Sequence, residues 1–192
     1  MGTSCSSMVQ PEDPKGLRFR VLKASQIARM HHSTSTVLPC GKIWVSGSNT
    51  HNTYRDVDSF PTEPRVEAFP PPYLDANFDR YRPQINEDAS EKELTYGGLF
   101  ETSFSVEDGA GLTKNNIKVS MYCPPFTIHG FSMGQRLLFL KIDVLIVEAQ
   151  EGFYRVRVEA PPSNAIAPPG YYLLFVVHRG LPAAKGIWVH IQ

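Results

Sequence analysis

Short runs of β-branched and aromatic residues, separated by turn residues, recur along the 192-residue chain. In the runs at 100–106 and 154–158 apolar and polar residues alternate, which places one face of a strand on a core and the other in water. Further strands are expected at residues 34–38, 42–46, 65–69, 94–96, 117–122, 136–140, 144–148, 171–177 and 187–191. So many short strands predict an all-β chain that contains an immunoglobulin-like β-sandwich.

A change of composition near residue 58 predicts a domain boundary, because a polar stretch there is followed by closely spaced prolines. Residues 1–16 are expected to form a disordered or loose N-terminus. Residues 17–57 hold one or two hairpins, with a turn at Pro39-Cys40-Gly41, and residues 58–192 can bury a sandwich core. A lone hairpin is marginally stable in water, so residues 17–57 are expected to belong to something larger.

Charge and composition remove several classes of function. The 19 basic and 19 acidic residues balance, so no general field attracts nucleic acid, and nucleic-acid binding is not expected. No apolar run is long enough for a transmembrane segment, and the polar start is not a secretory signal. Gly2 and Cys5 fit lipidation patterns, which keeps a membrane-tethered module as one hypothesis. The four basic residues between 17 and 29 are interpreted as a solvated face.

Histidines are the candidates for chemistry. His31 and His32 directly precede the first predicted hairpin, and His129 lies in a turn-rich segment between strands. Imidazole is a common ligand of copper and zinc, although each histidine taken alone favours a structural or exposed role. The odd number of cysteines indicates no disulfide framework. Phosphate-binding loops, the nucleophile elbow and the His-Glu-x-x-His motif are absent from the sequence.

Several ordered motifs carry a resemblance to a known family. They are the segments ARMHHS (28–33), LPCGKIWVSGSN (38–49), TIHGFSMGQR (127–136), PPGYY (168–172) and GIWV (186–189). Together they resemble the C-terminal part of plant glyoxal oxidases, which are copper radical aldehyde oxidases of the galactose oxidase superfamily. The resemblance implies that residues 17–57 form part of the last Kelch-type propeller blade. It implies further that residues 58–192 form the early-set, immunoglobulin-like domain, so that an incomplete β-propeller blade precedes the sandwich.

The same resemblance implies a chemistry and its residues. The family oxidises small aldehydes to carboxylic acids with copper and reduces O₂ to H₂O₂, outside the cell. His32 matches its first histidine ligand and His129 its second. His31 occupies the position of the family's axial tyrosine, which makes it a candidate catalytic residue. An imidazole there cannot supply the phenolate oxygen that the family uses as a base.

The family's radical cofactor, a tyrosine bonded to a cysteine, lies in upstream blades outside this sequence. The chain is therefore expected to be a truncated, inactive form whose copper is incompletely bound. The hydrogen bonds that orient the histidines are expected to be missing, and missing blades or an unknown partner are expected to cover residues 17–57. The alternative is a non-catalytic immunoglobulin-like binding module for carbohydrate or protein, with exposed aromatic residues such as Trp44 as the contact patch.

Overall fold

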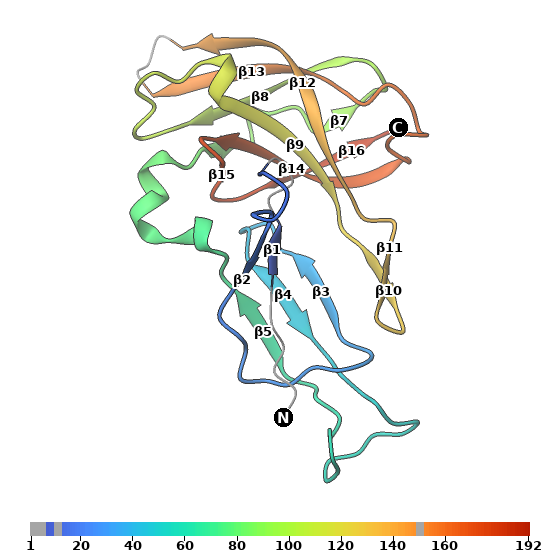
Figure 1. Cartoon of the computed structure of the whole chain (residues 1–192). Coiled ribbons are helices and arrows are strands. Elements are labelled where there is room, and N and C mark those ends of the chain that lie inside the picture. The colour runs from blue at the N-terminus through green and yellow to red at the C-terminus, as the bar shows by residue number, and fades with distance from the viewer. Residues whose placement is uncertain (1–6, 10–12, 149–151) are drawn as a thin grey trace. The chain divides into compact units, whose positions relative to one another are not determined.

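The computed structural model describes residues 7–9, 13–148 and 152–192, and its regular structure is almost entirely β (Figure 1). The helices among these residues are three short 3₁₀ helices: η1 (Pro72–Leu74), η2 (Ala76–Tyr81) and η3 (Lys114–Asn116). None of the helices in the described ranges has the length and hydrophobicity needed to cross a membrane. The all-β prediction is confirmed, as expected for a chain in which 16 prolines interrupt helices.

The chain forms two compact units, which are not continuous in sequence. The smaller unit contains the chain up to Ser35 together with Val45–Glu67 and Thr127–Ser132. The larger unit contains Thr36–Trp44, Ala68–Phe126 and Met133–Gln192. Each unit is described separately below.

The larger unit is a β-sandwich. Its strands are β6 (Gln84–Asn86), β7 (Glu93–Leu94), β8 (Leu99–Ser105), β9 (Ile117–Cys123), β12 (Arg136–Val147), β13 (Phe153–Glu159), β14 (Gly170–His178), β15 (Leu181–Pro182) and β16 (Ile187–Ile191). They are hydrogen-bonded in the order β6-β8-β13-β12-β9-β14-β16-β7, and β15 pairs with β14.

Strand β12 belongs to both layers of the sandwich. One layer continues through β13, β8 and β6, and the other through β9, β14, β16 and β7. Its first half pairs with β9, and its second half pairs with β13 after a register shift between Ile142 and Val144. A bulge bends a strand and increases its twist, which lets one long strand pass from one layer to the other. The sequence pattern predicted two separate strands here, at 136–140 and 144–148, because the residues around the bulge interrupt the alternation.

The sandwich core follows the period-two pattern of the sequence. On β8 and β13 the buried side chains lie opposite each other, in the pairs Phe104–Tyr154 and Phe100–Val158. The rings of Phe104 and Tyr154 stack with their centroids 5.5 Å apart. Full burial of such a side chain stabilises a fold by about 1.5–3 kcal/mol. Buried residues of β9, β14 and β16 complete this core: Val119, Met121, Tyr172, Leu174, Val176, Val189 and Ile191.

A separate three-stranded sheet has the order β3-β4-β5, formed by β3 (Thr34–Val37), β4 (Ile43–Ser46) and β5 (Val66–Phe69). The turn predicted between the first two strands is confirmed: Gly41 has a φ of 79° and its N–H donates to the Leu38 carbonyl. The run at 65–69 was expected among the sandwich strands, but it pairs in this sheet instead. Trp44 lies half-buried in β4.

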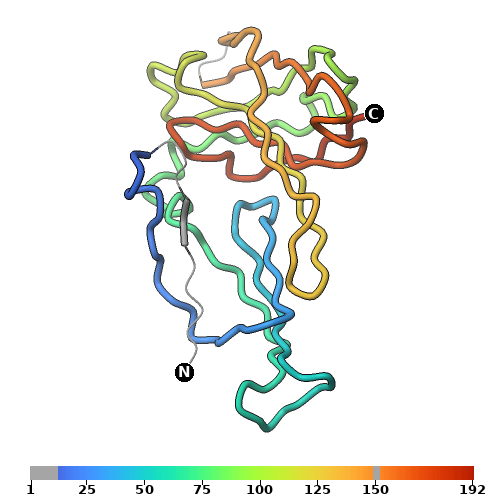
Figure 2. The backbone as a smooth tube through the Cα atoms, turned by 45° about the vertical axis from the view of Figure 1, so that its right-hand side comes forward, coloured from blue at the N-terminus to red at the C-terminus, as the bar shows by residue number. Residues whose placement is uncertain are grey.

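Two further strand pairs were not predicted. Strand β1 (Ser7–Val9) pairs with β2 (Phe19–Val21), so part of the segment expected to be loose is a strand. Strands β10 (Phe126–Ile128) and β11 (Phe131–Met133) form a hairpin between β9 and β12, and the tube in Figure 2 follows the chain through it. Its short strands and central turn residues read as a loop in the sequence.

Candidate metal centre

The His31-His32 pair lies in a tight turn before β3. His32 has a φ of 60°, in the left-handed region that residues other than glycine seldom adopt. The Asn49 N–H donates to the His31 carbonyl over 2.8 Å. Gly47 lies so close that a Cβ there would be 2.9 Å from the His32 carbonyl oxygen. The turn therefore depends on the segment 47–49, which directly follows the predicted strand at 42–46.

His129 occupies the turn of the β10–β11 hairpin. His129 has a φ of 51° and Gly130 a φ of 84°, which is the pattern of a two-residue type I′ turn. Only glycine enters this region freely, so the Gly at the second position allows the His at the first. A Cβ on Gly130 would lie 3.5 Å from the backbone nitrogen of His32, which shows how closely the turn approaches the histidine pair.

The structure brings the three candidate histidines together within the smaller unit. His32 Nε2 lies 3.1 Å from His129 Nδ1, across 97 residues of sequence. The ring centroids of His31 and His32 are 4.0 Å apart. The Thr34 hydroxyl donates to the Thr127 hydroxyl over 2.9 Å and joins the start of β3 to the hairpin.

A supporting hydrogen bond decides which nitrogen of His32 can bind a metal. His32 Nδ1 lies 2.8 Å from the backbone carbonyl oxygen of Asn49. A carbonyl can only accept, so Nδ1 must carry the proton and Nε2 must carry the lone pair. That lone pair points toward His129. The expectation that such orienting hydrogen bonds are missing is therefore wrong for His32.

The separation of the two facing nitrogens suits a shared metal ion. Two nitrogens that each lie about 2 Å from one ion, at right angles to each other, are about 3 Å apart. In the structure His129 Nδ1–H donates a hydrogen bond to His32 Nε2 over 3.1 Å, and an ion bound between the two nitrogens would take the place of that proton. Imidazole nitrogen suits copper and zinc. Within the described ranges, no three or more His, Cys, Asp or Glu side chains are arranged as a complete metal site. The structure thus shows two facing imidazole nitrogens, His32 Nε2 and His129 Nδ1, with the His31 ring beside that of His32.

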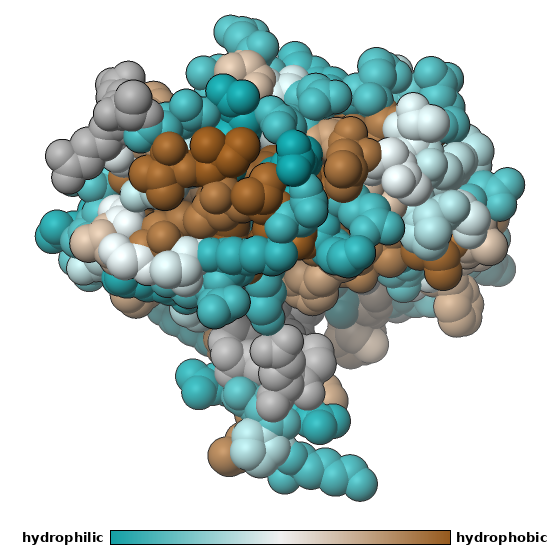
Figure 3. Space-filling model, turned by 90° about the horizontal axis from the view of Figure 1, so that it is seen from above, coloured by the Kyte–Doolittle hydropathy of each residue, from teal (hydrophilic) through white to brown (hydrophobic). Residues whose placement is uncertain are grey.

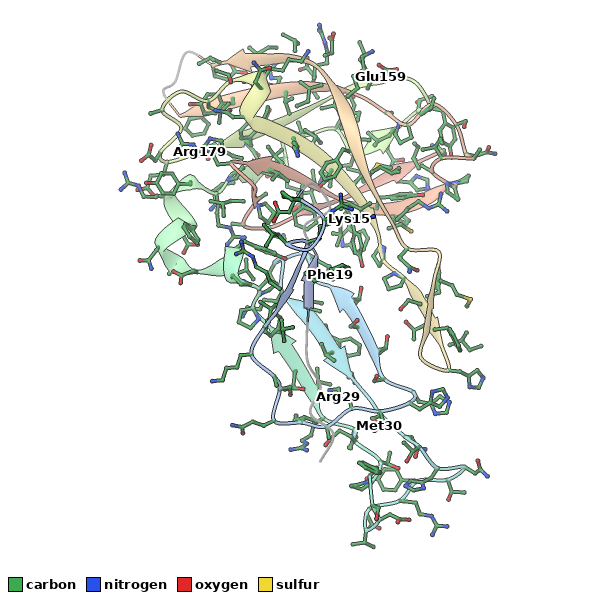
Figure 4. The ribbon with its side chains drawn as sticks, viewed as in Figure 1. Lys15, Phe19, Arg29, Met30, Glu159 and Arg179 are labelled. Carbon is green, nitrogen blue, oxygen red and sulfur yellow. The ribbon has the colours of Figure 1, made fainter. Side chains whose placement is uncertain are left out.

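An ion pair fixes the segment that leads into the histidine turn. Arg29, labelled in Figure 4, has a side chain only 3% exposed and lies 2.9 Å from a Glu67 carboxylate oxygen. It also donates to the carbonyls of Gly47 and Arg65. The Ser25 hydroxyl and the Arg29 guanidinium lower the pKa of Glu67. The sequence interpretation of a solvated basic face is wrong for Arg29.

The other histidines and the cysteines lie elsewhere or have separate partners. His51 bonds to the Phe60 carbonyl, and His178 is buried and donates to the Tyr81 carbonyl. Cys40 is exposed and Cys123 is half-buried, and both are free thiols. Burial raises the pKa of the Cys123 thiol. Gly2 and Cys5, the predicted lipidation positions, lie outside the described residues.

Comparison with known proteins agrees with this fold. Residues 82–191 match the family model "Galactose oxidase-like, Early set domain", and residues 4–73 match "Glyoxal oxidase N-terminus". The sandwich is therefore an early-set domain of the galactose oxidase-like class, and the segment before it matches the N-terminal model of glyoxal oxidases. The chain belongs to the galactose oxidase-like family, and the resemblance to glyoxal oxidases is confirmed.

Curated relatives match nearly the whole chain. Aldehyde oxidase GLOX1 of Arabidopsis thaliana is 41% identical over 96% of this chain and 29% of its own length. Aldehyde oxidase GLOX of Vitis pseudoreticulata is 39% identical over 96% of this chain and 34% of its own length. Art an 7 of Artemisia annua is 44% identical over 95% of this chain and 30% of its own length. The chain spans about a third of the length of these relatives.

A solved structure shares the fold. It is described as a novel fungal alcohol oxidase with catalytic diversity among the AA5 family, in complex with copper. The TM-score is 0.67 at 21% identity, and the match covers 94% of this chain and 34% of that one. At this identity the likeness establishes the fold alone.

Proposed function

We propose that this chain supplies two imidazole ligands, His32 Nε2 and His129 Nδ1, to the copper centre of an extracellular aldehyde oxidase. The observation that carries the proposal is the 3.1 Å separation of these two nitrogens, which come from distant parts of the sequence. The names of the relatives as aldehyde oxidases support the reaction class. The copper in the solved neighbour supports the choice of metal.

A bound copper ion would supply one-electron exchange between Cu(II) and Cu(I). In the proposed overall reaction an aldehyde hydrate loses two electrons and two protons to become a carboxylic acid. O₂ takes up both electrons and both protons and becomes H₂O₂. A small aldehyde is therefore the substrate class that we propose.

The chain's own residues have defined tasks in this proposal. The Asn49 carbonyl holds the proton on His32 Nδ1 and so keeps a lone pair on Nε2. The type I′ turn presents His129 at the tip of a hairpin. His31, at the family's axial tyrosine position, has its ring 4.0 Å from that of His32 and tilted against it, and it offers an imidazole in place of a phenolate. We propose that this exchange weakens proton abstraction, because neutral imidazole is a weaker base than phenolate.

Copper titration of matched variants tests the ligand assignment. We expect the full chain to bind one Cu(II) with nitrogen superhyperfine structure in its electron paramagnetic resonance spectrum. His32→Ala and His129→Ala should each weaken binding by at least about tenfold, because one of two facing donors is lost. His51→Ala is the matched control, since its ring in the same unit bonds to the Phe60 carbonyl. Equal copper affinity in all three variants would refute the assignment.

A further inference from the structure

The backbone of Asn49 contacts both histidines of the turn. Its N–H donates to the His31 carbonyl over 2.8 Å, and its carbonyl accepts from His32 Nδ1 over 2.8 Å. The preceding residue also contacts the segment that leads into the turn. The Ser48 hydroxyl oxygen accepts from the N–H of Met30, which is labelled in Figure 4, over 2.7 Å. The direction of the Asn49 carbonyl therefore decides where the proton of the His32 ring lies.

The side chain of Asn49 restrains the peptide group that carries this carbonyl. Asn49 Oδ1 accepts from the His51 backbone N–H over 3.0 Å, which closes an Asx turn. The peptide bond between residues 49 and 50 lies inside the ring that this hydrogen bond closes. The carbonyl that contacts His32 belongs to that same peptide bond. The side-chain hydrogen bond therefore fixes the direction in which the carbonyl points.

Thr62 closes the loop that follows Asn49 onto the same side chain. Its hydroxyl donates to Asn49 Oδ1 over 3.2 Å and accepts from the Arg55 N–H over 2.9 Å. The Thr62 N–H donates to the Arg55 carbonyl over 2.7 Å, and the Glu63 N–H donates to the Ser48 carbonyl over 2.8 Å. All of these residues belong to the smaller unit. Both ends of the loop are thus anchored at the residues that contact the histidine turn.

We propose that Asn49 and Thr62 are positioning residues for the metal ligand His32, an inference that rests on the proposed function. The Asx turn directs the Asn49 carbonyl at His32 Nδ1, and the Thr62 hydroxyl holds the Asn49 side chain in the turn. With the proton on Nδ1, the lone pair on His32 Nε2 faces His129. Asparagine suits this place because its oxygen accepts two hydrogen bonds while its Nδ2 donates to the Thr53 carbonyl over 3.5 Å.

Nuclear magnetic resonance of the metal-free chain tests the positioning directly. Long-range proton–nitrogen correlation spectra distinguish protonated from unprotonated ring nitrogens, and the His32 signals are those missing from His32→Ala. We expect the proton on Nδ1 of His32 in the unchanged chain. In Asn49→Ala the ratio of the Nδ1–H form to the Nε2–H form should fall about tenfold, which corresponds to the net contribution of one hydrogen bond. Asn49→Asp keeps the acceptor oxygen and should keep the Nδ1–H form.

Three further variants separate positioning from stability. Thr62→Val should lower the same ratio about threefold, because the Asx turn itself remains. Asp75→Ala is the matched control: Asp75 Oδ1 accepts from the Asn77 N–H in a similar turn of the larger unit, whose sandwich is seen from above in Figure 3. It should lower the melting temperature and leave the His32 signals unchanged. His51→Ala keeps the backbone N–H of the Asx turn and should also leave them unchanged.

Copper titration measures the consequence for the ligand. Asn49→Ala should weaken Cu(II) binding about tenfold and Thr62→Val about threefold, because groups that orient a ligand contribute to metal affinity. A lower melting temperature in Asn49→Ala with unchanged His32 signals would overturn the proposal, since it would show a structural role alone. Loss of the Nδ1–H form in a chain that binds no copper would support the positioning of His32 and refute only the proposed function.

Discussion

At the scale of single residues, two candidate ligands adopt a backbone conformation that is unfavourable for them. His32 and His129 both have positive φ angles, and each such residue costs about 1–2 kcal/mol. At His129 the type I′ turn requires this conformation. At His32 it is held by the Asn49 contacts and by the room that Gly47 leaves. Strain held by so many contacts at two meeting residues is a feature of functional sites.

Replacing Gly47 with alanine should disturb this turn. The φ of Gly47 is 75°, and the new Cβ would lie 2.9 Å from the His32 carbonyl oxygen. We expect a loss of about 2 kcal/mol in the free energy of unfolding, from strain and steric overlap together. Gly97→Ala, with a similar φ of 67° and open space around it, should lose only about 1 kcal/mol. Chemical denaturation measures both, and equal losses would show that the His32 contact has no effect.

At the scale of elements, side-chain bonds connect segments that are distant in sequence. The Thr34–Thr127 hydrogen bond connects β3 to the β10–β11 hairpin. The Arg29–Glu67 pair connects the segment before the histidine turn to β5. The buried guanidinium of Arg29 also donates to two backbone carbonyls. Neutral carbonyls do not balance its charge, and loss of the Glu67 carboxylate would therefore leave a buried charge poorly compensated. The position of the histidine turn therefore depends on contacts between elements.

The Arg29–Glu67 pair should make stability depend on pH. The pKa of Glu67 is lowered from its ordinary value of 4.5 by the Ser25 hydroxyl and by Arg29. A depressed carboxyl pKa stabilises the fold above the pKa of the unfolded state, and this stability is lost as pH falls through the folded-state pKa. The wild-type chain should therefore have a higher melting temperature than Glu67→Gln at pH 7. This difference in melting temperature should shrink below about pH 4.5. Thermal melts at several pH values measure this, and a constant difference would contradict it.

At the scale of the whole molecule, the candidate ligands and the hydrophobic core belong to different compact units. His31, His32 and His129 fall in the smaller unit, and the sandwich core falls in the larger one. The described residues bring two imidazole donors face to face, but they do not complete a site of three or more ligands. The predicted division at residue 58 stays a prediction, because the compact units interleave along the sequence.

We expect these 192 residues, loaded with copper, to release little or no H₂O₂ from methylglyoxal. The reason is chemical: two facing imidazoles hold copper less firmly than a full ligand set, and His31 offers no phenolate base. A peroxidase-coupled assay measures the rate, and the copper-loaded full-length Arabidopsis relative is the positive control. Sustained turnover that disappears in His32→Ala would contradict the expected inactivity while supporting the ligand assignment.

Much of the fold could be predicted because its signals are local. Alternation at 100–106 and 154–158 places Phe104 and Tyr154 in the core, where they stack. The β10–β11 hairpin was missed because its strands are short and His-Gly is an uncommon pair for a type I′ turn. The bulge in β12 was missed because one additional residue breaks the alternation, and two strands are then the simpler interpretation.

The sequence by itself determined the β class, most strand positions and, through the resemblance to glyoxal oxidases, the family and the choice of His32 and His129. Periodicity and turn chemistry act between near neighbours, so they can be read from a linear string. Only the tertiary structure decided that His32 Nε2 faces His129 Nδ1, that Asn49 fixes the proton on His32, and that Arg29 is buried against Glu67. These contacts join residues 17 to 97 positions apart, and their geometry depends on how the whole chain folds.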